Sequence, residues 1–263
     1  ILTANNLNDF QKYLILQEKS KATTKKYFRD AKVFADFAGN EEIRKEIVIA
    51  YKEHLRENHA VRSVNSMLAS INSLFAFLGW FDLKIKALKV QHQVFCSEEK
   101  ELTKAEYARL CKAAQSNHNE RLNLILQTIC ATGIRVSELR FITVEAVKQS
   151  EATVSLKGKT RSIFIVKDLK KKLLRYAAKQ NIKSGMIFVT RTSKPINRTN
   201  IWREMKNLCK KANVNPQKVF PHNLRHLFAR VFYNIEKDIA KLADILGHSS
   251  INTTRIYIIS TGT

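Results

Sequence analysis

Through the first ninety positions, hydrophobic residues recur every three or four places along the chain. Four segments with this spacing are separated by short connections: residues 7–17, 22–39, 41–58 and 61–80. The apolar positions are Leu7, Phe10, Leu14 and Ile15 in the first segment, and Tyr27, Ala31, Phe34 and Phe37 in the second. Such a period places them on one face of a helix, and that face must be covered by neighbouring helices. The pattern predicts a compact bundle of four helices.

The helical period is lost after Trp80, which indicates a boundary between two domains. Part of residues 86–100 is predicted to be a linker, and we place the linker at residues 91–100. The helical bundle then occupies residues 1–90, and a second domain is expected over residues 101–263.

Helices begin again after the linker. Thr103 and Glu106 have the spacing of a capping box, in which each side chain bonds the other residue's backbone N–H at a helix start. A strongly apolar segment, residues 119–133, follows and is predicted to be a helix that ends at Gly133.

Residues 151–166, EATVSLKGKTRSIFIV, break the helical pattern. Two short β-branched runs flank KGKT at residues 157–160, which is typical of a β-hairpin. Helical spacing resumes at residue 168 and continues to the end, interrupted by MIFV and by turns at Pro216 and Pro221. The predicted fold class is mainly α with a small β-hairpin.

The chain carries 46 Lys and Arg residues against 23 Asp and Glu, a formal net charge of +23. Most of this surplus lies after residue 97. Such a charge is far more than solubility requires, and it predicts a polyanionic partner. The cations are spread along the chain and form no polybasic block beside an anchor, so nucleic acid is favoured over a membrane surface.

No apolar run approaches the length of a membrane span, and polar residues interrupt the first twenty positions, which excludes a signal-peptide core. Cys96, Cys111, Cys130 and Cys209 include no CxxC pair and no evenly recurring framework. They are expected to be reduced, mostly buried thiols. These features predict a cytoplasmic, nucleoid-associated protein.

The stretch PHNLRHLFAR, residues 221–230, places cations beside an apolar helix face. His222 and Arg225 are three positions apart and project near each other at the margin of that face. Taken alone, the stretch fits a solvated helix edge with a capping histidine about as well as it fits a site. Metal ligation by His222 and His226 is disfavoured, since no Glu follows as in HExxH and no third ligand is suggested.

Two further stretches place polar groups just after glycine helix stops. ATGIRVSELR puts Arg135 in a turn where its planar guanidinium can be aimed at a phosphate, with Glu138 as a structural partner. LGHSSINTTRIY exposes His248 after Gly247 and begins a last helix that carries Tyr257. That helix is expected to be anchored by its isoleucines, Ile251, Ile256, Ile258 and Ile259. Taken singly, a tyrosine there is more often a packed residue than a nucleophile.

Together these residues form an ordered pattern: Arg135, a hairpin lysine, His222-x-x-Arg225, Gly247-His248 and Tyr257. Their order, types and spacings resemble the tyrosine recombinase (phage integrase) family, particularly its compact Xer-like members, across nearly the whole chain. ATGIRVSEL, HNLRHLFA and LGHSSINTTRIY each resemble a family motif. The resemblance implies an N-terminal four-helix core-binding (SAM-like) domain and an α+β catalytic domain, which together clamp duplex DNA.

The resemblance also implies the chemistry. A tyrosine, here Tyr257, attacks the scissile phosphodiester and leaves a 3′-phosphotyrosyl bond and a free 5′-hydroxyl, so neither ATP nor another cofactor is needed. With no metal, the negative charge of the transition state must meet fixed donors. Arg135, Arg225 and His248 match the family's clamp on the phosphate oxygens, and His222 matches a position for proton transfer and phosphate contact.

In the family a hairpin lysine acts as the general acid that protonates the leaving 5′-oxygen. Lys157 aligns with it, and Lys159 is the alternative. His226 is expected only to support the site. Tyr233 and Tyr176 are rival nucleophiles, but neither follows an LGH motif.

Contacts to DNA are expected from both domains. Residues 22–30 resemble the family's DNA-facing second helix, and residues 197–211 have a basic face before an apolar one. The candidates are Thr24, Lys25 and Arg29 in the first domain and Lys159, Arg161, Arg198, Thr199 and Arg203 in the second.

The sequence therefore predicts a site-specific recombinase that binds double-stranded DNA and assembles as a homotetrameric synapse around a Holliday junction. Accessory directionality or activating proteins are further possible partners, and no membrane partner is expected. A type IB topoisomerase shares the chemistry but acts as a monomer, and a DNA-binding module that has lost catalysis is the third alternative.

Overall fold

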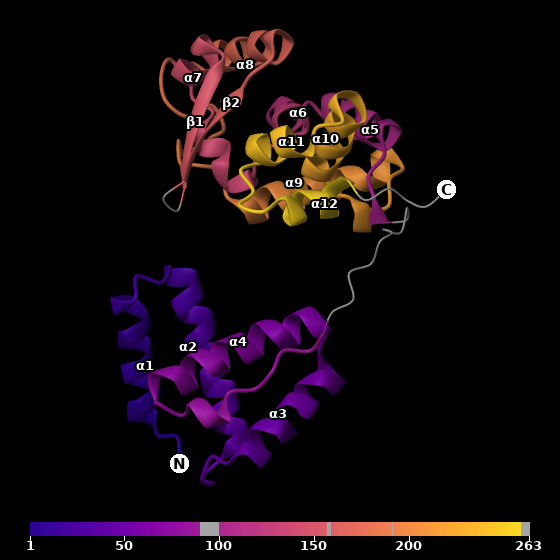
Figure 1. The fold of residues 1–263 in the computed structure, drawn as a ribbon. Coiled ribbons are helices and arrows are strands. Elements are labelled where there is room, and N and C mark those ends of the chain that lie inside the picture. Colours follow the sequence, from indigo (N-terminus) through magenta and orange to yellow (C-terminus); the bar gives the residue numbers. More distant parts are fainter. Residues whose placement is uncertain (90–99, 157–158, 191, 259–263) are drawn as a thin grey trace. The chain divides into compact units, whose positions relative to one another are not determined.

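The computed structural model describes residues 1–89, 100–156, 159–190 and 192–258 (Figure 1). The contacts within the chain divide it into two compact units, Ile1–His92 and Gln93–Thr263. Most of the predicted linker lies outside the described residues, so the exact domain limits stay a prediction. No helix of the described ranges is long and apolar enough to cross a membrane.

The first unit is built from four helices, as the hydrophobic spacing predicts. They are α1 (Ala4–Leu16), α2 (Lys21–Ala38), α3 (Lys45–Asn58) and α4 (Val61–Phe77), followed by the short 3₁₀ helix η1 (Phe81–Leu83). Local polar groups set the helix starts: Thr3 forms a capping box with Asn6 before α1, and the Ser20 side chain accepts the Thr23 N–H before α2. The expected third helix begins later than residue 41, at Lys45.

Aromatic side chains fill the core of this unit. Phe34 of α2 lies edge-on against Tyr51 of α3 and Phe75 of α4, with ring centroids 5.1 and 5.6 Å apart. Two residues of the predicted stripes are not in the core, since Ile15 is 61% exposed and Phe37 is 41% exposed. Ile15 follows Leu14 by one position, which turns it about 100° around the helix axis and out of the bundle.

The second unit is mainly helical and contains one two-stranded antiparallel sheet among its described residues. Its elements are α5 (Lys104–Ser116), α6 (Glu120–Thr132), η3 (Val136–Phe141), α7 (Val144–Gln149), β1 (Glu151–Leu156), β2 (Lys159–Phe164), α8 (Lys167–Lys179), α9 (Arg198–Ala212), η4 (Pro216–Lys218), α10 (Pro221–Glu236), α11 (Ile239–Leu246) and α12 (Ile251–Ile258). The predicted capping box of Thr103 and Glu106 is present at the start of α5.

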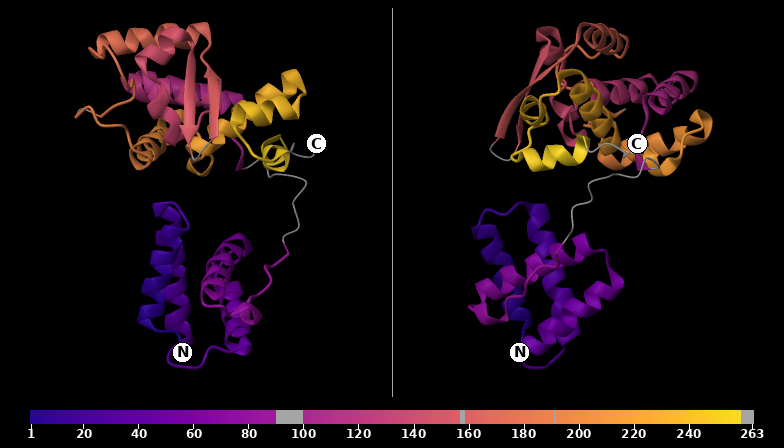
Figure 2. Two further views of the ribbon diagram at one scale, coloured as in Figure 1. Left: turned by 60° about the vertical axis from the view of Figure 1, so that its left-hand side comes forward. Right: turned by 45° about the vertical axis from the view of Figure 1, so that its right-hand side comes forward.

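The hairpin is paired from Glu151 opposite Phe164 to Leu156 opposite Lys159. Lys159 and Thr160 therefore belong to strand β2, and the expectation that they form part of the turn is wrong. Lys157 and Gly158 lie outside the described residues. Figure 2 shows the hairpin beside α7 and α8, with α12, in yellow, along α10 and α11.

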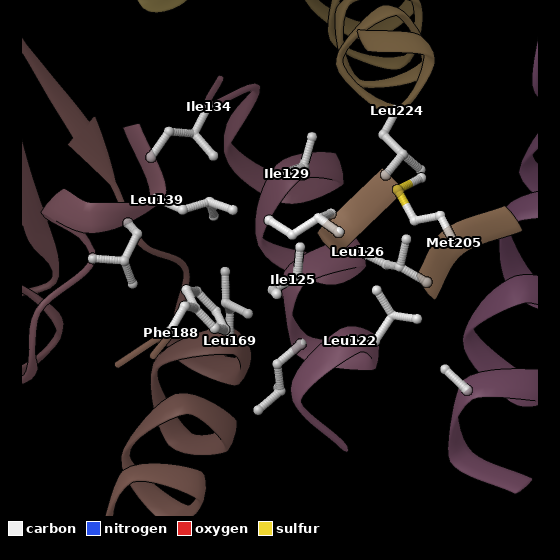
Figure 3. Packing of buried hydrophobic residues seen from close by; sticks show 14 of the residues in the cluster. Leu122, Ile125, Leu126, Ile129, Ile134, Leu139, Leu169, Phe188, Met205 and Leu224 are labelled. Atoms are coloured by element: carbon white, nitrogen blue, oxygen red, sulfur yellow. The ribbon is translucent and has the colours of Figure 1, made fainter. Parts of the chain in front are cut away.

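Helix α6 runs through the main core of the second unit. Figure 3 shows its residues Leu122, Ile125, Leu126 and Ile129 among side chains from η3, α8, α9 and α10. The helix contacts α5, α8, α9 and α10, so its C-terminus is fixed by packing on several sides. The segment that follows, with Arg135, begins from this fixed end.

Gly133 ends α6 in the left-handed region, with φ +64°. A Cβ added there would lie 2.5 Å from the ring of Phe228 on α10 and 2.9 Å from Leu246 on α11. Glycine is thus required both by its backbone conformation and by the close approach of α10 and α11.

We expect Gly133→Ala to destabilise the second unit by more than the ~1–2 kcal/mol that a left-handed conformation alone costs an L-residue, because the methyl group also displaces Phe228. Gly185→Ala is the matched control, since Gly185 also has positive φ but has open space around its Cβ position. Urea unfolding of both variants measures the difference. Equal losses of stability would show that the approach of α10 to Gly133 does not matter.

Candidate active site

The side chain of Arg225 lies at the centre of the site and is only 1% exposed. Its Nη1 donates to the carbonyl of Gly133, and its Nη2 donates to the carbonyl of Leu246 at 2.6 Å. A buried guanidinium is costly unless its donors are paired, and these carbonyls supply acceptors. Burial, followed by the nearby Arg135, lowers the pKa of Arg225 to about 10, so it remains a cation at neutral pH.

The two carbonyls that hold Arg225 belong to the C-terminal ends of α6 and α11. Helix C-termini carry partial negative charge, which stabilises a cation placed against them. Gly247 ends α11 with φ +64°, and a Cβ there would lie 2.7 Å from the guanidinium of Arg161. The glycines of ATGIR and LGH thus bring two helix ends to one arginine.

Arg135 follows Gly133 and is held by Glu138, which is buried at 1% exposure. The Arg135 N–H and guanidinium donate to the two Glu138 carboxylate oxygens at 2.8 and 3.0 Å. Arg161 of β2 donates to the same two oxygens at 3.0 and 2.7 Å. Burial alone would raise the pKa of Glu138, but the hydrogen bonds from Arg161 and Arg135 hold it below its usual range. The expectation that Glu138 supports Arg135 is confirmed.

His248 follows Gly247 and is held on both sides of its ring. Its Nε2 lies 3.0 Å from Nη2 of Arg225, and its Nδ1 lies 2.9 Å from the hydroxyl of Thr254 on α12. Burial, followed by the charges of Arg225 and Arg135, lowers the pKa of His248 to about 4. The imidazole is therefore neutral at neutral pH in the free protein.

Tyr257 is 6% exposed, and its hydroxyl lies 3.0 Å from Nε2 of His222. Its ring packs against the imidazoles of His226 and His248, with centroids 4.1 and 4.9 Å apart. The zeta carbon of Arg225 lies 5.9 Å from the ring centroid. The hydroxyl therefore faces polar groups of α10, within reach of a proton acceptor.

The anchoring of α12 differs from the expectation. Thr254 and Tyr257 are its buried residues, whereas Ile251 is 48% exposed and Ile256 is 41% exposed. Ile258 packs partly against the cluster around Tyr257. The predicted isoleucine anchor is wrong for Ile251 and Ile256, because the helix turns its two polar site residues toward α10 and α11. Ile259 lies outside the described residues.

A cleft lies beside these residues on the surface of the second unit. Arg135, His222 and Arg225 line it together with Arg198, Trp202 and Phe220. A second hollow adjoins Arg135 and is lined by Arg161, Gly247 and His248. The structure thus brings together five of the six predicted catalytic residues from four separate parts of the chain: Arg135, His222, Arg225, His248 and Tyr257. The sixth, Lys157, lies outside the described residues, and only the backbone of its alternative, Lys159, is described.

The histidines around Tyr257 are poor cations in the free protein. Partial burial and then Arg225 lower the pKa of His222, and burial followed by His222 lowers the pKa of His226 to about 4. A neutral His222 can accept the Tyr257 proton, and its pKa would rise if an anion entered the cleft. The described residues contain no group of three or more His, Cys, Asp or Glu arranged to hold a metal ion. The expectation of metal-free chemistry remains a prediction.

The rival tyrosines lie elsewhere. Tyr176 of α8 belongs to the main core, where burial raises the pKa of its hydroxyl. Tyr233 of α10 is partly buried beside Lys237 at the other end of the helix from His222. Tyr257 differs from both in that its hydroxyl bonds His222, a residue that lines the cleft with Arg135.

The residues predicted to contact DNA differ in how exposed their side chains are. Lys25 and Arg29 on α2, and Arg198, Thr199 and Arg203 in the first two turns of α9, are exposed. Three candidates do not offer a free side chain. The exposed Arg29 donates from Nη2 to Asp30 at 3.1 Å. Thr24 is 6% exposed, and the Arg161 side chain is 14% exposed and committed to Glu138.

Three contacts or residues near the site and the candidate DNA-binding residues were not predicted from the sequence. On α2, the buried Asp30 accepts from Lys26 at 2.6 Å and from Ser70 of α4 at 2.8 Å. At the cleft, Trp202 is 47% exposed beside Arg198. On α12, Thr254 contacts His248. Only Thr254 had a sequence signal, since it precedes Tyr257 by one helical turn.

Comparisons with known proteins agree with this architecture. Residues 100–262 match the phage integrase family, and residues 7–80 match the phage integrase N-terminal SAM-like domain. The chain belongs to the phage integrase family. The family resemblance and the fold class predicted from the sequence are therefore confirmed.

Within this family, similar proteins cover nearly the whole chain. Tyrosine recombinase XerA of Pyrococcus horikoshii is 29% identical over 98% of this chain and 90% of that protein. A crystal structure of XerA recombinase is 26% identical, with a TM-score of 0.55, over 97% of this chain and 92% of that chain. A lambda integrase tetramer bound to a Holliday junction shares the fold at 18% identity, with a TM-score of 0.77, over 96% of this chain and 76% of that chain.

We expect the half-buried His226 to make the stability of the second unit depend on pH. The folded-state pKa of His226 is about 4, against 6.5 for a free histidine. Between these values the unfolded chain binds a proton that the folded chain does not, so stability is full above about pH 6.5 and falls as the pH drops toward 4. Urea unfolding of wild type and His226→Gln at pH 7.0, 5.5 and 4.5 measures this. The variant should lose less stability on acidification, and parallel losses would contradict the assignment.

Proposed function

We propose that this protein is a site-specific tyrosine recombinase that cleaves and rejoins DNA through a 3′-phosphotyrosyl intermediate. One observation carries the proposal: the Tyr257 hydroxyl bonds a histidine that lines the same cleft as Arg135 and Arg225. An isolated packed tyrosine would have no reason to meet three histidines and a buried guanidinium. The pairing of a nucleophile with a proton acceptor beside fixed cations is the arrangement that phosphoryl transfer requires.

In the proposed first step, the Tyr257 oxygen forms a bond to the scissile phosphorus and the bond to the 5′-oxygen breaks. The Tyr257 proton passes to Nε2 of the neutral His222, which lies at hydrogen-bond distance. The leaving 5′-oxygen takes a proton from a general acid, a role that the family resemblance gives to Lys157. Attack by a 5′-hydroxyl of the partner strand reverses these steps, so the energy of the phosphodiester is conserved.

The charge of the transition state falls on the nonbridging phosphate oxygens. Arg135 and Arg225 enter the cleft with their positions fixed by Glu138 and by two helix ends. Donors that are already oriented need no reorganisation when charge develops, which is the main source of electrostatic catalysis. We assign the same role to His248, which becomes a donor at Nε2 when it is protonated.

The position of α12 supports assembly of the site within one protomer. The helix packs on α10 and α11 of its own chain, so each subunit brings its own nucleophile. Four subunits on two DNA duplexes would then exchange strands in pairs through a Holliday junction. Two similar proteins support this tetrameric assembly over a monomeric topoisomerase. One is the lambda integrase tetramer bound to a Holliday junction, and the other is XerA, which is a tyrosine recombinase.

DNA binding would rest on four exposed cations and one exposed threonine. Lys25 and Arg29 would contact DNA from the first unit, and Arg198, Thr199 and Arg203 from the second. Because contacts to phosphates release counterions, affinity should fall steeply with salt. Its DNA substrate would place the enzyme in the cytoplasm, at the nucleoid.

The proposal is tested by covalent trapping. A binding site is first selected from random duplexes with Tyr257→Phe, and the selected duplex is then nicked near its centre so that cleavage releases a short fragment and cannot be reversed. We expect wild type to give a slow-migrating protein–DNA adduct on a denaturing gel.

Tyr257→Phe should abolish this adduct, and Tyr233→Phe, the control, should retain it. Tight binding of the selected duplex without any adduct would contradict the proposal and favour a DNA-binding module without catalysis. An adduct that survives in Tyr257→Phe would place the nucleophile elsewhere.

A further inference from the structure

The hydroxyl of Thr254 makes an unusual contact for a residue at the start of an amphipathic helix. Thr254 is completely buried, at 0% exposure, and its Oγ1 lies 2.9 Å from Nδ1 of His248. A threonine hydroxyl of this kind normally bonds a carbonyl of the preceding turn or faces water. Here it meets a side chain from the loop that ends α11.

The partner on the other side of the imidazole fixes the direction of both hydrogen bonds. A guanidinium has donors and no acceptor, so Nη2 of Arg225 donates to Nε2 of His248. A neutral imidazole has a single N–H, which must then be on Nδ1 and must donate to Thr254. The lowered pKa of His248 agrees with this neutral form.

Thr254 also links this imidazole to the nucleophile. It precedes Tyr257 by three positions, so both side chains leave the same face of α12. They are the buried residues of that helix. When α12 packs against α10 and α11, the Tyr257 hydroxyl therefore meets His222 and the Thr254 hydroxyl meets His248 at the same time.

We propose that Thr254 is a positioning residue that accepts the Nδ1–H of His248, supports together with Arg225 the tautomer that carries this proton, and makes the ring orientation depend on the docking of α12. A subunit whose α12 leaves its place would lose the nucleophile and the support of His248 together. A half-assembled site, with a competent phosphate clamp but no tyrosine, is thereby avoided.

The consequence for catalysis rests on the function proposed above. When a phosphate enters, its oxygens become acceptors for Arg225, and His248 can donate from Nε2 only after gaining a proton there. Nδ1–H is already bonded to Thr254, and the hydroxyl accepts equally well from the imidazolium. Thr254 thus holds one ring orientation through both protonation states.

Titratable and charged groups surround His248 on several elements, and the ring of Tyr257 on α12 lies 4.9 Å from its imidazole. Arg135 and Glu138 approach from the segment after α6, Arg161 from β2, and Asp244 from α11. Arg225 and His222 approach from α10. The cations raise the energy of the imidazolium in the free protein, and a phosphate dianion or phosphodiester would relieve this.

Three variants separate the effect of the Thr254 hydrogen bond from that of its packing: Thr254→Val, Thr254→Ser and Thr253→Val. Valine keeps the shape and removes the hydroxyl, whereas serine keeps the hydroxyl. Thr253 is the adjacent, exposed threonine and serves as the control. Two readouts are used: the ¹⁵N spectrum of the imidazoles in the full-length free protein, and single-turnover cleavage of the nicked duplex. The His248 signal is assigned from its loss in His248→Asn.

We expect the His248 signal of wild type to be that of an Nδ1–H tautomer, kept in Thr254→Ser, Thr253→Val and Tyr257→Phe. In Thr254→Val the Nδ1–H is left without its acceptor, so the ring should turn away from Arg225 and the signal should shift toward the Nε2–H form or average between the two tautomers. Cleavage by Thr254→Val should fall by about 10- to 100-fold, as when a metal-bound histidine loses the partner that orients it, with DNA affinity unchanged. Thr254→Ser should recover most of the rate.

An unchanged tautomer in Thr254→Val would overturn the inference. An equal loss of cleavage in Thr254→Val and Thr254→Ser would also overturn it, because it would show that Thr254 acts through packing alone. The imidazole spectrum needs no DNA, so it tests the role of Thr254 even if the wild-type protein forms no covalent adduct. Failure of the recombinase proposal is therefore distinguishable from failure of this one.

Discussion

The buried guanidinium of Arg225 is the constraint on which the catalytic half of the molecule depends. It carries a charge at 1% exposure, and the carbonyls that compensate this burial come from the ends of α6 and α11. A shift of either helix end would leave the cation without acceptors, and breaking a buried charged contact is strongly destabilising. The arginine therefore determines how α6, α10 and α11 meet, and Gly133 allows their close approach.

From Arg225 the order of the site spreads outward through polar contacts. Its guanidinium bonds His248, His248 bonds Thr254, and Thr254 lies one turn before Tyr257 on α12. A separate buried carboxylate, Glu138, holds Arg135 at the edge of the same cleft. The arrangement that we propose to bind phosphate is thus largely built in the free protein, which would lower the reorganisation needed in the transition state.

Much of this could be predicted from the sequence because it is locally encoded. Hydrophobic period and capping residues gave the helices, and three short motifs gave the residues around Tyr257. Features decided by contacts between distant segments were not predictable. The pairing of Arg161 with Glu138 joins residues 23 positions apart, and the burial of Thr24 follows from helix packing. The isoleucines of α12 were misassigned because a short helix bearing both apolar and polar site residues can turn either set inward.

The central claim is that Arg225 is a planar phosphate donor held by two helix ends, and single-turnover cleavage by Arg225→Lys tests it most directly. Lysine keeps the charge but cannot span both carbonyls and a phosphate. We predict DNA affinity within a few-fold of wild type and a cleavage rate lower by about 10²–10³, the cost of losing one oriented donor to a transition-state oxygen. The exposed Arg140→Lys should cleave like wild type. Equal cleavage by Arg225→Lys and wild type would contradict the account.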